Sequence, residues 1–132
     1  MPIKKFNRKQ ANLPIDIDHN DTIYYKSQQI DIEMVKQPES IGGGAQRECH
    51  IFTSDDEKHS LGIWESTAFH SEMRMFSYDE YAIVIDGEVC VTDSEGREYH
   101  FLPDDVIYIT KGTVCSWHSD NYFKKVYYIQ YV

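Results

Sequence analysis

The sequence predicts an all-β fold, either a sandwich or a barrel. From residue 49 to residue 131, short apolar segments recur about every ten residues, with turn-forming residues between them. Some of them, such as residues 68–76, alternate in the manner of a strand with two different faces. No segment sustains the apolar periodicity of a long helix. The length of 132 residues fits one domain spanning 1–132.

Composition excludes several classes of protein. Hydrophobic residues make up 41% of the chain and aromatic residues 14%, which excludes a disordered chain. The net charge of −9 argues against binding to nucleic acid and to anionic membranes. No stretch approaches the ~20 apolar residues of a membrane span, and no apolar segment of a secretory signal follows the basic residues 1–10.

Cysteine usage predicts a reducing compartment. The three cysteines, Cys49, Cys90 and Cys115, form no Cys-x-x-Cys pair, and their odd number does not suit a disulfide framework. We therefore expect a cytoplasmic protein.

The first 48 residues carry the weaker strand signals. Residues 1–20 are predicted to form an N-terminal arm, and residues 22–35 to hold two short strand-like pieces. Residues 36–48 are predicted to be a loop, in which Gly42–Gly44 serve as a flexible turn. The Lys-Ser/Thr pair of a phosphate-binding loop does not follow these glycines.

The strands beyond residue 49 are defined by the turns between them. Apolar segments at 49–53 and 61–66 are split by a polar loop, and Asp86-Gly87 after the segment 80–85 is a strong hairpin signal. The remaining turns are expected at residues 93–96, 103–105 and 111–112. In 68–76, one predicted face carries Phe69, Ser71, Met73 and Met75, and the other carries His70, Glu72 and Arg74.

Two spacings carry a resemblance to a known family. Glu80, six intervening residues and Gly87 match the end of the first cupin motif, and the run Asp104 to Gly112 matches the second. In that second run, Asp104 replaces the first glycine of the motif and Thr110 replaces its proline. Over residues 50–132 the chain resembles the small cupins related to ethanolamine-utilisation proteins and ureidoglycine aminohydrolase. The resemblance implies a double-stranded β-helix, a jelly-roll barrel with one open mouth, to which the first half of the chain adds strands.

Many cupins hold a divalent metal with three histidines and a glutamate. Carried over by position, the first two histidines fall on Met73 and Met75, or with the shorter spacing on Arg74 and Phe76, and the third falls on Cys115. Only Glu80 and Cys115 offer ligand atoms, which are too few for a site of this type. We therefore expect no metal and no cofactor. The alternative is a different metal site built from Glu80 and one or two histidines, although His70 and His118 are expected to point outward.

Strand parity predicts what the cavity contains instead. If Glu80 faces inward, the same face of the neighbouring strands carries methionine, tryptophan and small side chains, which suit an organic ligand. The predicted ligand-binding residues are Met73, Met75, Glu80, Cys115 and Trp117, to which the resemblance to cupins adds Trp64 from the matching stretch 62–66. Glu80 is the candidate catalytic residue, as a general acid or base with a raised pKa. The alternative is a structural Glu80 paired with a lysine or a tyrosine hydroxyl.

These observations predict a cupin that binds a small organic metabolite carrying an amine or a hydroxyl group. Two alternatives stay open: a small-molecule enzyme with metal or acid/base chemistry, and a non-catalytic interaction protein. A homodimer is expected, because the segments 79–85 and 106–110 are apolar on both faces and need cover on both.

Overall fold

The computed structural model describes residues 3–7, 35–37 and 43–131, and every structural statement below concerns these residues. Most of the predicted arm and the strand pieces at 22–34 lie outside them. The described chain is all-β and contains no helix that could cross a membrane. Its strands are β1 (Ile3–Asn7), β2 (Val35–Gln37), β3 (Gln46–Thr53), β4 (His59–His70), β5 (Arg74–Met75), β6 (Asp79–Gly87), β7 (Val89–Asp93), β8 (Glu98–Phe101), β9 (Asp105–Ile109) and β10 (Val114–Gln130).

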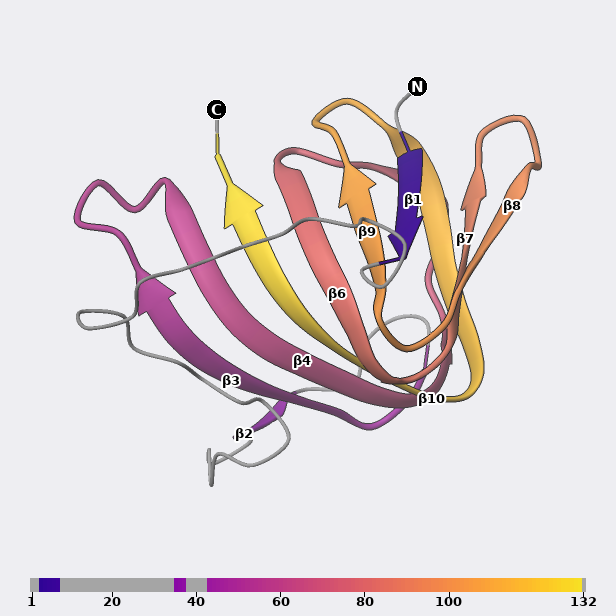
Figure 1. Cartoon of the computed structure of the whole chain (residues 1–132), viewed down its shortest axis with the longest axis horizontal. Coiled ribbons are helices and arrows are strands. Elements are labelled where there is room, and N and C mark those ends of the chain that lie inside the picture. Colours follow the sequence, from indigo (N-terminus) through magenta and orange to yellow (C-terminus); the bar gives the residue numbers. More distant parts are fainter. Residues whose placement is uncertain (1–2, 8–34, 38–42, 132) are drawn as a thin grey trace.

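The long strand β10 joins the two parts of the barrel. Its first half pairs with β5 and β7, its second half pairs with β6, and β4 follows it on the other side. The full strand order is β1-β9-β6-β10-β4-β3-β2, and β8 continues from β7. Figure 1 shows β10 between β4 and β6, with β3 and the β7–β8 hairpin at opposite ends of the view. This arrangement confirms the predicted jelly-roll barrel with extra N-terminal strands.

The predicted hairpin at Asp86-Gly87 is wrong. Strands β6 and β7 do not pair with each other, because both pair with successive parts of β10. Gly87 adopts a left-handed φ of 73° and lies against the backbone of Tyr122, where β10 itself bends. A side chain at this position would collide with the Tyr122 carbonyl. The Asp-Gly pair therefore carries the chain from the part of β10 that pairs with β6 to the part that pairs with β7.

The predicted continuous strand over residues 68–76 is also wrong. Strand β4 ends at His70, residues 71–73 are irregular, and β5 begins at Arg74. The irregular residues reverse the alternation, so Arg74 and Phe76 point into the barrel where Met73 and Met75 were expected. The predicted loop at 36–48 is shorter than expected, since β2 takes its first two residues and β3 its last three.

The core lies on the inner side of the curved sheet. Its largest fully buried side chains are Phe101, Phe123, Ile107 and Ile109. On the outer face, Tyr81 stacks on Tyr108 with ring centroids 4.4 Å apart and stays 40% exposed. The homodimer expected through such a face remains a prediction.

Candidate functional site

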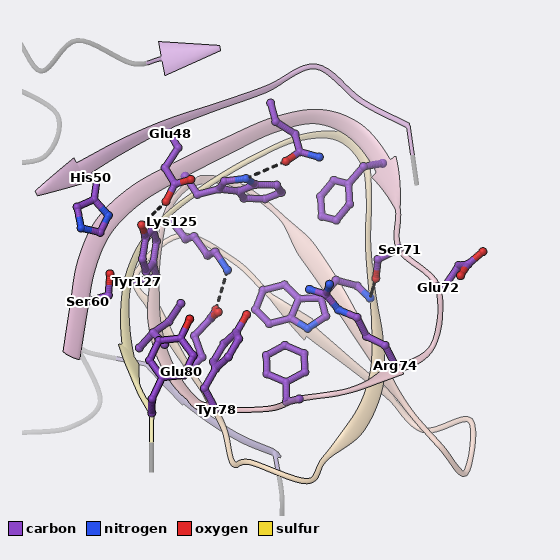
Figure 2. A pocket seen from close by; sticks show the side chains of 17 residues that line it. Glu48, His50, Ser60, Ser71, Glu72, Arg74, Tyr78, Glu80, Lys125 and Tyr127 are labelled. Carbon is purple, nitrogen blue, oxygen red and sulfur yellow. Dashed lines mark hydrogen bonds and ion pairs between the residues drawn. The ribbon is translucent and has the colours of Figure 1, made fainter. Parts of the chain in front are cut away.

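A cavity of about 580 Å³ opens inside the barrel. Its wall combines aromatic rings with charged groups, as Figure 2 shows. The lining residues are Gln46, Glu48, His50, Ser60, Trp64, Phe69, Ser71, Glu72, Arg74, Phe76, Tyr78, Glu80, Trp117, Lys125, Tyr127, Ile129 and Tyr131. A volume of this size accommodates a small organic molecule.

A buried ion pair forms the centre of the cavity wall. Lys125 Nζ lies 2.6 Å from Glu80 Oε2, and both residues are less than a tenth exposed. The same ammonium lies 4.4 Å from the Trp117 ring centroid and 5.4 Å from that of Trp64. Each charge is stabilised by its partner, and the aromatic faces stabilise the ammonium further. The sequence reading in which Glu80 pairs with a lysine therefore agrees with this geometry.

Alternation along two neighbouring strands directs these side chains inward. In β6, Glu80, Ala82 and Val84 are buried, while the residues between them are more exposed. In β10, Phe123, Lys125 and Tyr127 form the buried series. Because β6 and β10 are adjacent antiparallel strands, the two inward series face the same space.

A second polar contact closes one side of the cavity. The Tyr127 hydroxyl donates to Glu48 Oε1 on β3, and burial followed by this contact raises the pKa of Tyr127. The contact depends on Gly62, which lies opposite Tyr127 in the pairing of β4 with β10. A Cβ atom at Gly62 would collide with the Tyr127 hydroxyl, so glycine leaves the space that this ring occupies.

Tyr78 lies beside Glu80 on the lower wall in Figure 2. Burial, and then the negative charge of Glu80, raises the pKa of Tyr78 to about 12. Its hydroxyl is therefore protonated at neutral pH and is a hydrogen-bond donor to a ligand. Tyr78 also packs against Phe76 and Tyr131, with ring centroids 5.4 Å away in each case.

The opposite wall carries a second cation. Arg74 extends into the cavity in Figure 2, and its guanidinium carbon lies 5.8 Å from the Phe76 ring centroid. Phe76 stacks in turn on Trp117 at 6.2 Å. The Trp117 backbone N–H donates to Ser71 Oγ over 2.8 Å, which ties the irregular segment 71–73 to β10. The cavity therefore has positive charge on two sides.

The structure brings together only some of the predicted ligand-binding residues. Trp64, Glu80 and Trp117 line the cavity. Met73 and Met75 are 46% and 66% exposed and face away from it, so placing them in the wall was wrong. The reason is the reversed alternation at residues 71–73.

Cys115 is fully buried in the hydrophobic core and does not line the cavity. Burial raises the pKa of its thiol to about 11, against a smaller opposite effect of Trp117. The thiol is therefore protonated at neutral pH, and a ligand in the cavity does not reach it.

Sequence reasoning missed Lys125, Arg74 and Glu48 as members of one site. The signal for Lys125 was available, because it occupies the inward parity of the segment 123–129 together with Phe123 and Tyr127. Glu48 had no such signal, since residues 36–48 were predicted to be a loop.

The donor set does not fit the cupin metal. At the four positions of the usual ligands, this chain has Arg74 and Phe76 facing inward, Glu80 bound to Lys125, and Cys115 beneath the cavity surface. Among the described residues that line the cavity, no three histidine, cysteine, aspartate or glutamate side chains bring ligand atoms together.

Solved structures support the fold. A protein of unknown function of the DUF861 family from Pseudomonas syringae pv. tomato has a TM-score of 0.69 and 19% identity, with 74% of this chain and 44% of that protein covered. The chain thus spans less than half the length of that relative. The cupin domain of Cnp3 from Schizosaccharomyces pombe has a TM-score of 0.62 and 11% identity, covering 83% of this chain and 74% of that one.

A putative ethanolamine utilization protein Q from Salmonella typhimurium has a TM-score of 0.57 and 20% identity, with 65% of this chain and 69% of that one covered. At these identities the likenesses show the fold alone. A comparison with curated protein sequences found no significant match. The model of the EutQ-like cupin domain matches residues 53–127, which is more than half of the sequence. The chain therefore belongs to the EutQ-like cupin family.

Proposed function

We propose that the barrel cavity binds a small organic molecule that carries an amine or a hydroxyl group, without a metal. The observation that carries the proposal is the Lys125–Glu80 ion pair in the wall of an open cavity of about 580 Å³. Removing two charged groups from water costs free energy, and the barrel fold does not require either charge at this position. A ligand that forms hydrogen bonds with the two charged groups explains their presence in the cavity wall.

The chemistry of the wall defines the class of ligand. Carboxylates of Glu80 and Glu48 accept hydrogen bonds from an amine or a hydroxyl, while Tyr78 and Arg74 donate to oxygen atoms. The faces of Trp64 and Trp117 favour apolar or planar parts of the molecule. An amine-bearing ligand also agrees with the name of the Salmonella relative, an ethanolamine utilization protein.

A second candidate is acid/base catalysis in the same cavity. The distance of 2.6 Å between Lys125 Nζ and Glu80 Oε2 allows a proton to pass between the two groups. A substrate bound next to the ion pair can then donate a proton to it or accept a proton from it. The two candidates share one binding site, and turnover distinguishes them.

The test is a thermal-shift screen of small amines, amino alcohols and hydroxy acids, followed by calorimetric titration of each compound that stabilises the protein. The blocking variant is Ser60→Phe, which places a ring into the cavity from β4. The matched control is Ala68→Phe, which adds the same ring at an exposed position of the same strand.

We expect at least one class of compound to stabilise the wild type and the control, with at least tenfold weaker binding to Ser60→Phe. Binding that survives unchanged in Ser60→Phe places the ligand elsewhere and contradicts the proposal. A compound that binds and is chemically altered by the wild type, and not by Glu80→Gln, favours the enzyme.

A further inference from the structure

A row of metal-binding residue types crosses four strands at the end of the barrel that carries β7 and β8. His100 on β8 lies opposite Cys90 on β7, Cys90 lies opposite His118 on β10, and His118 lies opposite His70 on β4. Directly opposite residues on antiparallel strands project to the same side of the sheet. The four side chains therefore share one face.

This face is the outer one, so the row is separate from the cavity. Val89, Val91 and Phe101 belong to the hydrophobic core, and Cys90 and His100 alternate with them along β7 and β8. None of the four residues of the row lines the cavity. Cys90 is nevertheless only 4% exposed.

Three ligand atoms already converge where Glu98, two residues before His100 on β8, adds its carboxylate to the row. The Cys90 sulfur, a carboxylate oxygen of Glu98 and a ring nitrogen of His100 all lie within 4.8 Å of one another. His100 Nε2 is 3.3 Å from Glu98 Oε2. Ligand atoms around a tetrahedral zinc ion are roughly 3.5 Å apart, given metal–ligand distances of about 2.0 to 2.3 Å. Glu98 and His100 are both exposed, so small rotations of their side chains bring the three atoms to that spacing.

The neighbourhood is acidic, which favours a cation. A hollow of about 200 Å³ beside the cluster is lined by Cys90, His100 and His118 together with Glu88 and Asp120. Among the described residues that line this hollow, none is lysine or arginine. A bound cation would compensate the negative charge of Glu88 and Asp120 and displace the proton of the Cys90 thiol.

His118 supplies an independent observation. Its Nδ1 atom is buried and has no hydrogen-bond partner in the described part of the chain. The ring stacks on His70, with centroids 5.2 Å apart and an interplanar angle of 17°. A buried ring nitrogen without a partner is unusual, and here it lies on the strand next to Cys90. A fourth ligand, either His118 or water, would complete a tetrahedral site.

We propose that Cys90, Glu98 and His100 form a binding site for a zinc-like divalent ion on the outer face of the β7–β8 hairpin. Thiolate, imidazole and carboxylate together are a ligand set that zinc accepts. The ion would cross-link β7 to β8, next to the strand that carries His118.

The test uses Co²⁺ as a spectroscopic probe of the full-length protein after reduction and treatment with a chelator. A thiolate ligand to Co²⁺ gives a near-ultraviolet charge-transfer band, which oxygen and nitrogen ligands do not give. We expect one equivalent of Co²⁺ to produce this band in the wild type, and Zn²⁺ to displace it. Cys90→Ser should lose the band, and His100→Ala and Glu98→Gln should each weaken binding at least tenfold.

Two controls locate the ion. Cys49→Ser removes the half-buried cysteine of β3, and Glu80→Gln changes the cavity; both should keep the band. Absence of the band in the wild type, or its survival in folded Cys90→Ser, overturns the proposal. Because Glu98 and His100 are exposed, their variants should fold even if Cys90→Ser does not, and unchanged Co²⁺ affinity in both contradicts the site equally.

Discussion

Lys125 reaches Glu80 across two adjacent strands of the barrel and holds its carboxylate at 2.6 Å inside a ring of aromatic side chains (Figure 2). The two residues are not opposite in the strand register, since Glu80 pairs with Ile129 and Lys125 with Val84. The long lysine side chain spans that offset along the surface of the cavity. It passes the faces of Trp117 and Trp64 on the way.

Removing one member of this pair should cost far more than removing both. Lys125→Met keeps most of the apolar side chain but leaves the Glu80 carboxylate buried without a partner, which we expect to cost about 3–5 kcal/mol of unfolding free energy. Adding Glu80→Gln to this variant should recover most of the loss. Urea unfolding of the wild type, both single variants and the double variant measures the coupling.

The control for this cycle is Lys124→Met, which changes the same residue type at the neighbouring position on the other face of β10. We expect Lys124→Met to change the free energy of unfolding only slightly. If the losses of unfolding free energy in Lys125→Met and Glu80→Gln simply add in the double variant, the ion pair does not stabilise the cavity wall.

The titration of Tyr78 should report the charge on Glu80. Burial is the larger cause of its raised pKa of about 12, and the Glu80 charge is the second. Glu80→Gln should therefore lower the pKa of Tyr78 but leave it above 10, the usual value. NMR titration of protein labelled with ¹³C at the tyrosine Cζ measures this pKa, and Tyr78→Phe assigns the resonance.

The sign of the stability change follows from the same pKa. Because folding raises the pKa of Tyr78, its contribution to stability is fully present below pH ~10 and is lost as the pH rises toward 12. Tyr78→Phe should lose stability less steeply than the wild type over this range. Equal slopes in the two proteins would show that Tyr78 ionises as freely in the folded chain as in the unfolded one.

The sequence predicted the fold because turn residues and alternation are local signals. It predicted Glu80 and Trp117 in the cavity for the same reason, since both lie on regular strands. Met73 and Met75 were misplaced because three irregular residues reverse the alternation, and nothing in the segment 71–73 marks that change. The Asp86-Gly87 turn was assigned to a hairpin because an Asp-Gly pair after an apolar segment is a strong hairpin signal. The strand that β6 and β7 share lies about thirty residues further on, beyond the reach of any local pattern.

Asp104 occupies a backbone conformation that favours glycine. Its φ is 74°, at the position where the second cupin motif has glycine. A left-handed conformation costs most residues about 1–2 kcal/mol, and glycine avoids that cost. Asp104→Gly should therefore be more stable than Asp104→Ala by about 1 kcal/mol in urea unfolding. At Lys58, where φ is not positive, the same comparison should favour alanine or show no difference.

Acid should weaken the β7–β8 hairpin through Asp93. Its Oδ1 atom accepts hydrogen bonds from the backbone N–H groups of Glu95 and Arg97 at 2.9 and 3.0 Å, and Oδ2 accepts from Arg97 Nε at 2.9 Å. Desolvation alone would raise the pKa of Asp93, but these hydrogen bonds and the Arg97 charge outweigh it and lower the pKa. Relative to the protonated form, the ionised form of Asp93 is therefore more favoured in the folded chain than in the unfolded one.

Because the pKa is lowered on folding, the contribution of Asp93 is fully present above pH ~3.9 and is lost as the pH falls through the folded pKa. Asp93→Asn should reduce stability at neutral pH and show a shallower loss below pH ~4 than the wild type. The matched control, Asp55→Asn, removes the same charge in the exposed β3–β4 loop. Urea unfolding at several pH values measures all three slopes, and a wild-type slope equal to that of Asp93→Asn would mean that these hydrogen bonds do not favour the charged form.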